Sequence, residues 1–251
     1  QLRSITGRDI DSWMSQMRRD GKSSRTIVGA RRVLFGVFKN AYRQELIPRN
    51  PVEQTDAPKR QASEKSRVQE PWTEQEVIKA LEQSRMMDDS SKDVELFLCL
   101  AIYLGLRRGE ILGLKWSDID FDSRRLQVSR TLKEQRTSTR TGKGVIELVT
   151  DDPKTRSSAR TLPIVPTVIE ALERQMMRQS IARMQNPDLW QEQDWVFTTK
   201  TGTAPYPSNM SYRYKQFIKK NKLRHIRIHD LRHTSAVLAL TSGMPLEAVS
   251  Q

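Results

Sequence analysis

One stretch of the chain is apolar at every position, Leu96-Phe97-Leu98-Cys99-Leu100-Ala101-Ile102, and a basic turn follows it, Gly105-Leu106-Arg107-Arg108-Gly109-Glu110. The apolar stretch predicts a helix, over residues 93–104, that is buried on all sides. Gly105 is expected to end this helix, because glycine readily adopts the left-handed conformation found at helix ends. A further short helix should cover residues 108–115. The sequence therefore predicts a domain built around one buried helix, with Arg107 at the turn that follows it.

The segments around this helix predict a mainly α-helical domain with a small antiparallel β-sheet, an α+β fold. The domain should start at Trp72, and Thr73 and Glu76 have capping-box spacing at its first helix. Strands are expected within residues 118–131, 145–149 and 161–164, as one three-stranded antiparallel sheet. The elements predicted after them are a helix over 166–184, a short buried segment at 195–197, and helices over about 208–220, over 230–242 and from 245 onward.

The residues before this domain predict a small helical unit, 1–56, with a basic surface. Thr6 can cap a helix over 7–19, and a longer helix should run from Ser24 to about Gln44. Their expected apolar faces are Ile10, Trp13, Met14 and Met17 in the first helix, and Ile27, Ala30, Leu34, Val37, Phe38 and Ala41 in the second. A polar linker, 57–71, should connect this unit to the domain 72–251.

Charge and cysteine content narrow the class of protein. The 251 residues carry a formal net charge of +13, which favours a polyanionic partner, with DNA or RNA first and an anionic membrane as the weaker alternative. No apolar run is long enough to span a bilayer. Cys99 is the single cysteine, so no disulfide forms within the chain, which fits a reducing compartment. Its apolar neighbours indicate a core residue, not a nucleophile.

Three basic stretches hold candidate functional residues. The last is His229-Asp230-Leu231-Arg232-His233-Thr234, in which His229 and Arg232 share one helical face at i, i+3 spacing. Arg107 and Arg232 each offer a planar fork of donors that suits a phosphate. Lys154 is expected at the tip of a hairpin, where a lowered pKa would let it donate a proton at neutral pH. Taken one at a time, these residues also fit an ordinary surface salt bridge, a helix start and an exposed turn.

Metal binding is a rival interpretation. His225, His229 and His233 are the only histidines and are spaced by four, so that His229 and His233 could share a face as in helical zinc sites. The intervening Arg224, Arg227 and Arg232 would repel a cation, and no glutamate completes the pattern. We therefore predict no metal site.

Together these stretches resemble the tyrosine recombinase (phage integrase) family, as found in the integrases of phages and transposable elements. Gly105 to Asp120 resembles the first arginine box of the family, and His229 to Thr234 with Gly243 resembles the second. Pro153-Lys154-Thr155 and Arg160-Thr161-Leu162-Pro163-Ile164 resemble its hairpin lysine and the following strand. The resemblance covers essentially the whole chain. It implies a core-DNA-binding domain at 1–56, N-terminally incomplete, and a catalytic domain at 72–251, C-terminally incomplete.

The resemblance also implies a reaction, in which DNA strands are cut and rejoined through a 3′-phosphotyrosyl intermediate without metal or other cofactor. Arg107 and Arg232 would clamp the scissile phosphate, His229 would assist proton transfer, Lys154 would be the general acid, and Glu110 would support the arginine turn. The implied partners are double-stranded attachment-site DNA, three further copies in a tetramer, and accessory DNA-bending or directionality proteins, in the bacterial cytoplasm. The sequence departs from the family in one respect: no tyrosine follows Arg232, so we assign no nucleophile and expect the chain to bind DNA without cleaving it alone.

Three alternatives to a recombinase stay open on the sequence. A catalytically silent DNA-binding protein would retain the same clamp, which the missing tyrosine favours. A type IB topoisomerase would use similar chemistry without paired sites. A metal-dependent nuclease is a third alternative, against which the lack of clustered carboxylates argues.

Overall fold

The computed structural model describes residues 2–59, 69–87, 93–137, 145–151 and 160–244. The chain divides into two compact units, Gln1–Val68 and Gln69–Gln251. Most of the predicted linker, the predicted helix from residue 245 and the predicted lysine hairpin lie outside the described residues. No helix in the described ranges is both long and apolar enough to cross a membrane.

The first unit contains two α-helices, α1 (Gly7–Arg19) and α2 (Ser24–Arg43), which confirms the two predicted helices. Thr6 caps α1 in a reciprocal capping box with Asp9. Short 3-10 turns at Leu2–Ser4 and Pro51–Gln54 flank the pair. The small core of this unit consists of Ile10, Met14, Ile27, Phe38, Ala41, Ile47 and Val52.

Two residues assigned to the apolar faces of these helices are exposed. Trp13 is 37% and Val37 is 52% exposed, so the prediction that they face the core was wrong. Each helix turns by about 100° per residue, and its apolar stripe is wider than the surface that the other described segments of this unit cover.

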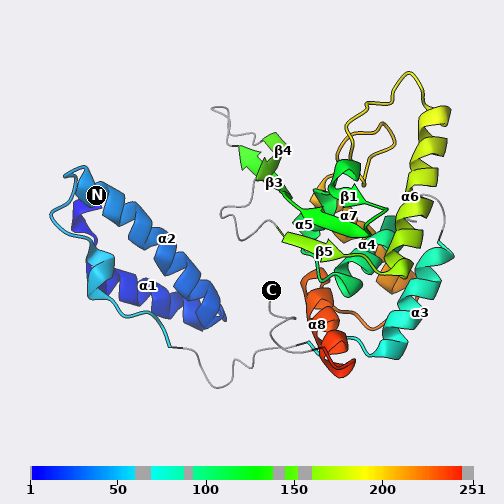
Figure 1. Cartoon of the computed structure of the whole chain (residues 1–251). Helices are drawn as coiled ribbons and strands as arrows, with labels where there is room; N and C mark the ends of the chain where they lie inside the picture. Colours follow the sequence, from blue (N-terminus) through cyan, green and yellow to red (C-terminus); the bar gives the residue numbers. More distant parts are fainter. Residues whose placement is uncertain (1, 60–68, 88–92, 138–144, 152–159, 245–251) are drawn as a thin grey trace. The chain divides into compact units, whose positions relative to one another are not determined.

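The second unit is organised around α4 (Asp93–Tyr103), in which every residue from Val94 to Ile102 is buried. Four helices of eleven or more residues contact α4 (Figure 1): α3 (Glu74–Arg85), α6 (Pro166–Gln185), α7 (Pro207–Lys220) and α8 (Leu231–Thr241). The capping box of Thr73 with Glu76 is present at the start of α3. Burial raises the pKa of the Cys99 thiol to about 12, which confirms Cys99 as a core residue. The predicted α+β class is confirmed.

The strands form two sheets instead of the single sheet that the sequence predicted. β1 (Ile119–Asp120), β2 (Arg125–Val128) and β5 (Arg160–Pro163) make an antiparallel sheet in the order β1-β2-β5, with Leu126 opposite both Ile119 and Leu162. β3 (Thr131–Thr137) and β4 (Val145–Asp151) pair with each other in a separate two-stranded sheet.

The break between the two sheets falls at Ser129 and Arg130. Arg130 pairs with Asp118 and also donates to the carbonyl of Gly113, and Ser129 donates to Asp118 at 3.0 Å. These side-chain contacts end β2 before β3 begins, and β3 then pairs with the next strand along the chain. The prediction that 145–149 joins the strand at 161–164 was therefore wrong.

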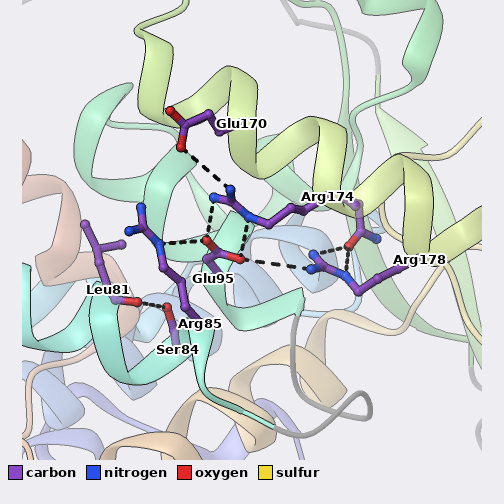
Figure 2. A network of polar contacts seen from close by, with 8 residues as sticks. Leu81, Ser84, Arg85, Glu95, Glu170, Arg174 and Arg178 are labelled. Carbon is purple, nitrogen blue, oxygen red and sulfur yellow. Dashed lines mark hydrogen bonds and ion pairs between the residues drawn. The ribbon is translucent and has the colours of Figure 1, made fainter.

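A buried carboxylate ties three helices of this unit together (Figure 2). Glu95 of α4 is 2% exposed and accepts hydrogen bonds from Arg85 of α3 at 3.1 Å and from Arg174 of α6 at 2.8 and 3.4 Å. Arg178, one turn further along α6, lies 4.0 Å from the same carboxylate. A buried charge is costly unless it is paired and hydrogen-bonded, and these guanidinium groups meet that requirement for Glu95.

Candidate functional site

The turn between α4 and α5 (Arg108–Leu112) presents Arg107 to solvent. Gly105 has a φ of +60°, which ends α4, and buried Leu106 donates its N–H back to the carbonyl of Leu100 at 3.3 Å. α8 packs closely against this turn, because a Cβ on Gly105 would lie 3.2 Å from the hydroxyl of Ser235. The side chain of Arg107 is 58% exposed. The fold therefore fixes the backbone of this arginine and leaves its guanidinium accessible.

Glu110 holds this turn from inside the protein. Its carboxylate is buried and accepts the backbone N–H of Arg107 at 2.9 Å and the Arg107 guanidinium at 2.8 Å. Burial acts to raise the pKa of Glu110, but hydrogen bonds from Arg160 and Arg107 outweigh it and hold that pKa below its usual value. Glu110 is thus a buried carboxylate kept in its charged form.

Arg232, in the first turn of α8, reaches the same turn. Its Nη1 donates to the carbonyl of Gly105 at 2.9 Å, although the two residues are 127 positions apart in the sequence. Burial and the nearby Arg107 lower the pKa of Arg232, against the opposite effect of Glu110. The fold therefore brings Arg232 to the turn that holds Arg107 and Glu110, from a distant segment of the sequence.

His229 lies in a 3-10 turn, Ile228–Asp230, just before α8. Its ring is exposed and meets the edge of His233, with the ring centroids 5.9 Å apart and the planes at 80°. The neighbouring Asp230 is buried and accepts from Arg227 at 2.7 and 3.0 Å, which anchors the turn. The histidine is therefore carried by a fixed backbone immediately before Arg232.

Lys154 lies outside the described residues. Within the described residues, no three or more histidine, cysteine, aspartate or glutamate side chains gather as possible metal ligands.

Arg160, the first residue of β5, was assigned no role from the sequence. Its guanidinium donates to both oxygens of Glu110, from Nη2 at 2.9 Å and from Nη1 at 3.3 Å. Its place in the stretch Arg160-Thr161-Leu162-Pro163-Ile164 pointed to a strand, but a charged residue at the start of a short strand is ordinary on a surface. Its buried partner lies 50 residues upstream, and only the folded chain shows the pair.

The arrangement suits a phosphate. The guanidinium groups of Arg107 and Arg160 pair with one carboxylate, and that of Arg232 lies near enough to feel its charge, so the cluster keeps a formal charge of +2. Arginine remains charged at any physiological pH and pairs two oxygens of a phosphate at once. Preorganised cations of this kind stabilise the charge that builds up when a phosphodiester is attacked.

Comparison with known proteins relates the chain to integrases and recombinases. The model of the phage integrase family matches residues 71–251. The chain is 30% identical over 255 residues to a "Tyrosine recombinase XerC-like" protein of Caldanaerobacter subterraneus subsp. tengcongensis, covering 96% of this chain and 62% of that protein. It is 26% identical to the "ICEBs1 integrase" of Bacillus subtilis, covering 96% of this chain and 61% of that protein. The chain thus spans less than two thirds of the length of these relatives.

A solved structure shares the fold. The Tn1549 transposon integrase, in complex with a circular intermediate DNA, matches with a TM-score of 0.71 at 22% identity, over 99% of this chain and 77% of that one.

Proposed function

The chain belongs to the phage integrase family, and from this premise we propose that it is the DNA-binding and phosphate-activating part of a site-specific tyrosine recombinase. Its substrate is double-stranded attachment-site DNA of a mobile element. The observation that carries the proposal is the hydrogen bond from Arg232 to the carbonyl of Gly105, which puts two arginines from distant segments at one turn.

In this proposal Arg107 and Arg232 grip the non-bridging oxygens of the scissile phosphate. They stabilise the pentacoordinate transition state, in which negative charge on those oxygens is greatest. Glu110 keeps the turn of Arg107 in place from the buried side. Because arginine side chains supply the positive charge, the reaction needs no metal ion or other cofactor.

His229 and Lys154 carry out the proton transfers of the proposed reaction. Cleavage breaks the bond between phosphorus and the 5′-oxygen, and Lys154 donates the proton that the departing 5′-hydroxyl requires. His229 contacts the phosphate and assists proton transfer at the attacking hydroxyl. The reverse step, attack of a 5′-hydroxyl on a 3′-phosphotyrosyl bond, joins the strands.

We assign no nucleophile within the 251 residues. All five tyrosines precede His229. Tyr214 is 3% exposed, its hydroxyl donates to the carbonyl of Ile226 at 3.2 Å, and burial raises its pKa, which together oppose nucleophilic attack. We propose that a tetramer on two duplexes, with accessory DNA-bending or directionality proteins, is the assembly that recombines DNA.

A joining assay tests this function with the chain as it is. The substrate is a nicked duplex, selected for binding from a randomised pool, whose 3′ end carries a p-nitrophenyl phosphate ester in place of phosphotyrosine. The 5′-oxygen forms a bond to phosphorus as the bond to p-nitrophenolate breaks, and the 5′ proton passes to the group that donates it in cleavage. We expect joining in the presence of a chelator, measured as p-nitrophenolate release and as sealed strand.

A second candidate function is a catalytically silent DNA clamp, which would bind the same duplex through the same arginines. Specific binding without joining would support this candidate and contradict the recombinase. Joining that requires added Mg²⁺ would contradict the metal-free mechanism.

A further inference from the structure

We propose that Arg160 is a positioning residue for this reaction, which holds the Glu110 carboxylate so that Arg107 keeps both its orientation and its charge for the phosphate. The inference rests on the proposed function and adds to it a residue that never touches the DNA.

Arg107 and Arg160 share the two oxygens of the Glu110 carboxylate. Oε1 of Glu110 accepts from the guanidinium of Arg107 at 2.8 Å and from Nη1 of Arg160 at 3.3 Å. Oε2 accepts from the backbone N–H of Arg107 and from Nη2 of Arg160, both at 2.9 Å. Each oxygen thus has one donor from Arg107 and one from Arg160. Because the two oxygens are held by a planar fork, the carboxylate cannot rotate without losing contacts to both arginines.

Of the two arginines that bind Glu110, Arg160 is held more firmly than Arg107. The side chain of Arg160 is only 19% exposed, and its backbone belongs to β5, where it pairs with Val128 of β2. The side chain of Arg107 is 58% exposed and stands at the start of a five-residue helix. Arg160 is therefore the more rigid donor. By holding the Glu110 carboxylate in place, it also fixes the orientation of the exposed Arg107.

Arg160 also affects the net charge that the cluster presents to a phosphate. A carboxylate paired with a single arginine would cancel most of the charge of that arginine towards a phosphate. With Arg160 also on Glu110, the pair of arginines and the carboxylate retain a net positive charge beside Arg232. Arg160 thus supplies the charge that neutralises Glu110 and leaves Arg107 available to the DNA.

A matched control comes from the other buried carboxylate of the same unit. Arg174 also donates to both oxygens of a buried glutamate, Glu95, at 2.8 and 3.4 Å (Figure 2). Arg174 has no contact with Arg107 or Glu110 among the described residues. Replacing it removes the same kind of interaction from the fold without touching the arginine turn.

The experiment measures the single-turnover joining rate at saturating enzyme, the Kd for the nicked duplex and the urea midpoint of each variant. We expect Arg160→Gln to lower the rate by about 10- to 100-fold, as for other residues that orient a reacting group, with a change in Kd below about threefold. Arg160→Lys, which keeps the charge and loses the fork, should recover part of the rate. Arg174→Gln should lower the urea midpoint and leave the rate unchanged.

Dependence on Arg107 separates positioning from a general structural effect. In an Arg107→Ala background, Arg160→Gln should cause no further loss of rate, because the residue through which it acts is gone. A normal rate in folded Arg160→Gln would overturn the inference and leave the proposed function intact. An equal additional loss in the Arg107→Ala background would also overturn it. If the unaltered chain binds the duplex without joining it, the proposed function fails and this inference fails with it.

Discussion

Two buried glutamates of the second unit, Glu95 and Glu110, are each surrounded by arginines, yet the two clusters are suited to different tasks. Every arginine at Glu95 comes from a helix of twelve or more residues, and its guanidinium lies within 4.0 Å of the carboxylate. At Glu110, by contrast, Arg107 comes from a turn and Arg232 pairs with a backbone carbonyl.

The two clusters differ in whether all of their guanidinium groups are directed at the carboxylate. In the described part of the chain, Arg232 makes no ion pair with a carboxylate, and its hydrogen bond to the carbonyl of Gly105 uses a single nitrogen. The Glu95 cluster joins α3, α4 and α6, and each of its guanidinium groups lies within 4.0 Å of that carboxylate. In our proposal, similar residue types therefore stabilise the fold in one place and bind a phosphate in the other, according to whether all of the cations are directed at a carboxylate.

The largest expected effect is on Arg232. Arg232→Ala should lower the joining rate by at least about 100- to 1000-fold, because it removes a cation aimed at the transition-state oxygens. Its Kd for duplex DNA should change far less, since the chain carries many other basic residues that attract a phosphate backbone. Joining rates and titrations with labelled duplex measure the two quantities. An unchanged joining rate would contradict the assignment of the site.

The next effect is on stability. Glu95→Gln should lower the free energy of unfolding by about 2 kcal/mol, less than the roughly 3–5 kcal/mol of a fully buried pair because Arg85 and Arg174 are partly exposed. Urea denaturation monitored by tryptophan fluorescence measures it. The joining rate of the folded variant should be normal, and a loss of rate would remove the distinction between the two clusters.

A smaller and pH-dependent effect is expected for Glu110. Its pKa is held below the usual value in the folded state, so its interactions stabilise the protein above the unfolded pKa of about 4.5 and are lost as the pH falls through the folded pKa. Glu110→Gln should cost about 1–2 kcal/mol at pH 7, from the loss of charged hydrogen bonds. The difference from the unaltered protein should shrink in urea titrations below pH 4.5. A difference that is constant with pH would show that the carboxylate charge is not what holds the turn.

The smallest effect is expected at an ion pair outside both clusters. Arg183 and Glu192 lie 3.0 Å apart with side chains 63% and 65% exposed. Arg183→Ala should change the free energy of unfolding by less than about 0.5 kcal/mol, since solvent screens such pairs. A much larger loss in the same urea experiment would mean that burial is not what distinguishes the two clusters from surface pairs.

Much of the local structure could be predicted from the sequence. The capping residues Thr6 and Thr73, the buried helix around Cys99 and the glycine that ends it are set by neighbours within a few positions. These signals depend on backbone hydrogen bonds and helical periodicity, which act over one or two turns. The basic stretches that carry Arg107 and Arg232 were found in the same way, because their residue types point to phosphate chemistry wherever they lie.

Only the tertiary structure decided which of these residues meet. The partition of the strands into two sheets depends on Arg130 and its contacts with Asp118 and Gly113, and the pairing of Arg160 with Glu110 joins segments 50 residues apart. Nothing in the local sequence shows that arginines gather at Glu95 or that Arg160 lies beside Glu110. Both clusters arise only when the helices and strands pack, because packing directs the guanidinium groups at Glu95 to one carboxylate and brings Arg232 to the carbonyl of Gly105.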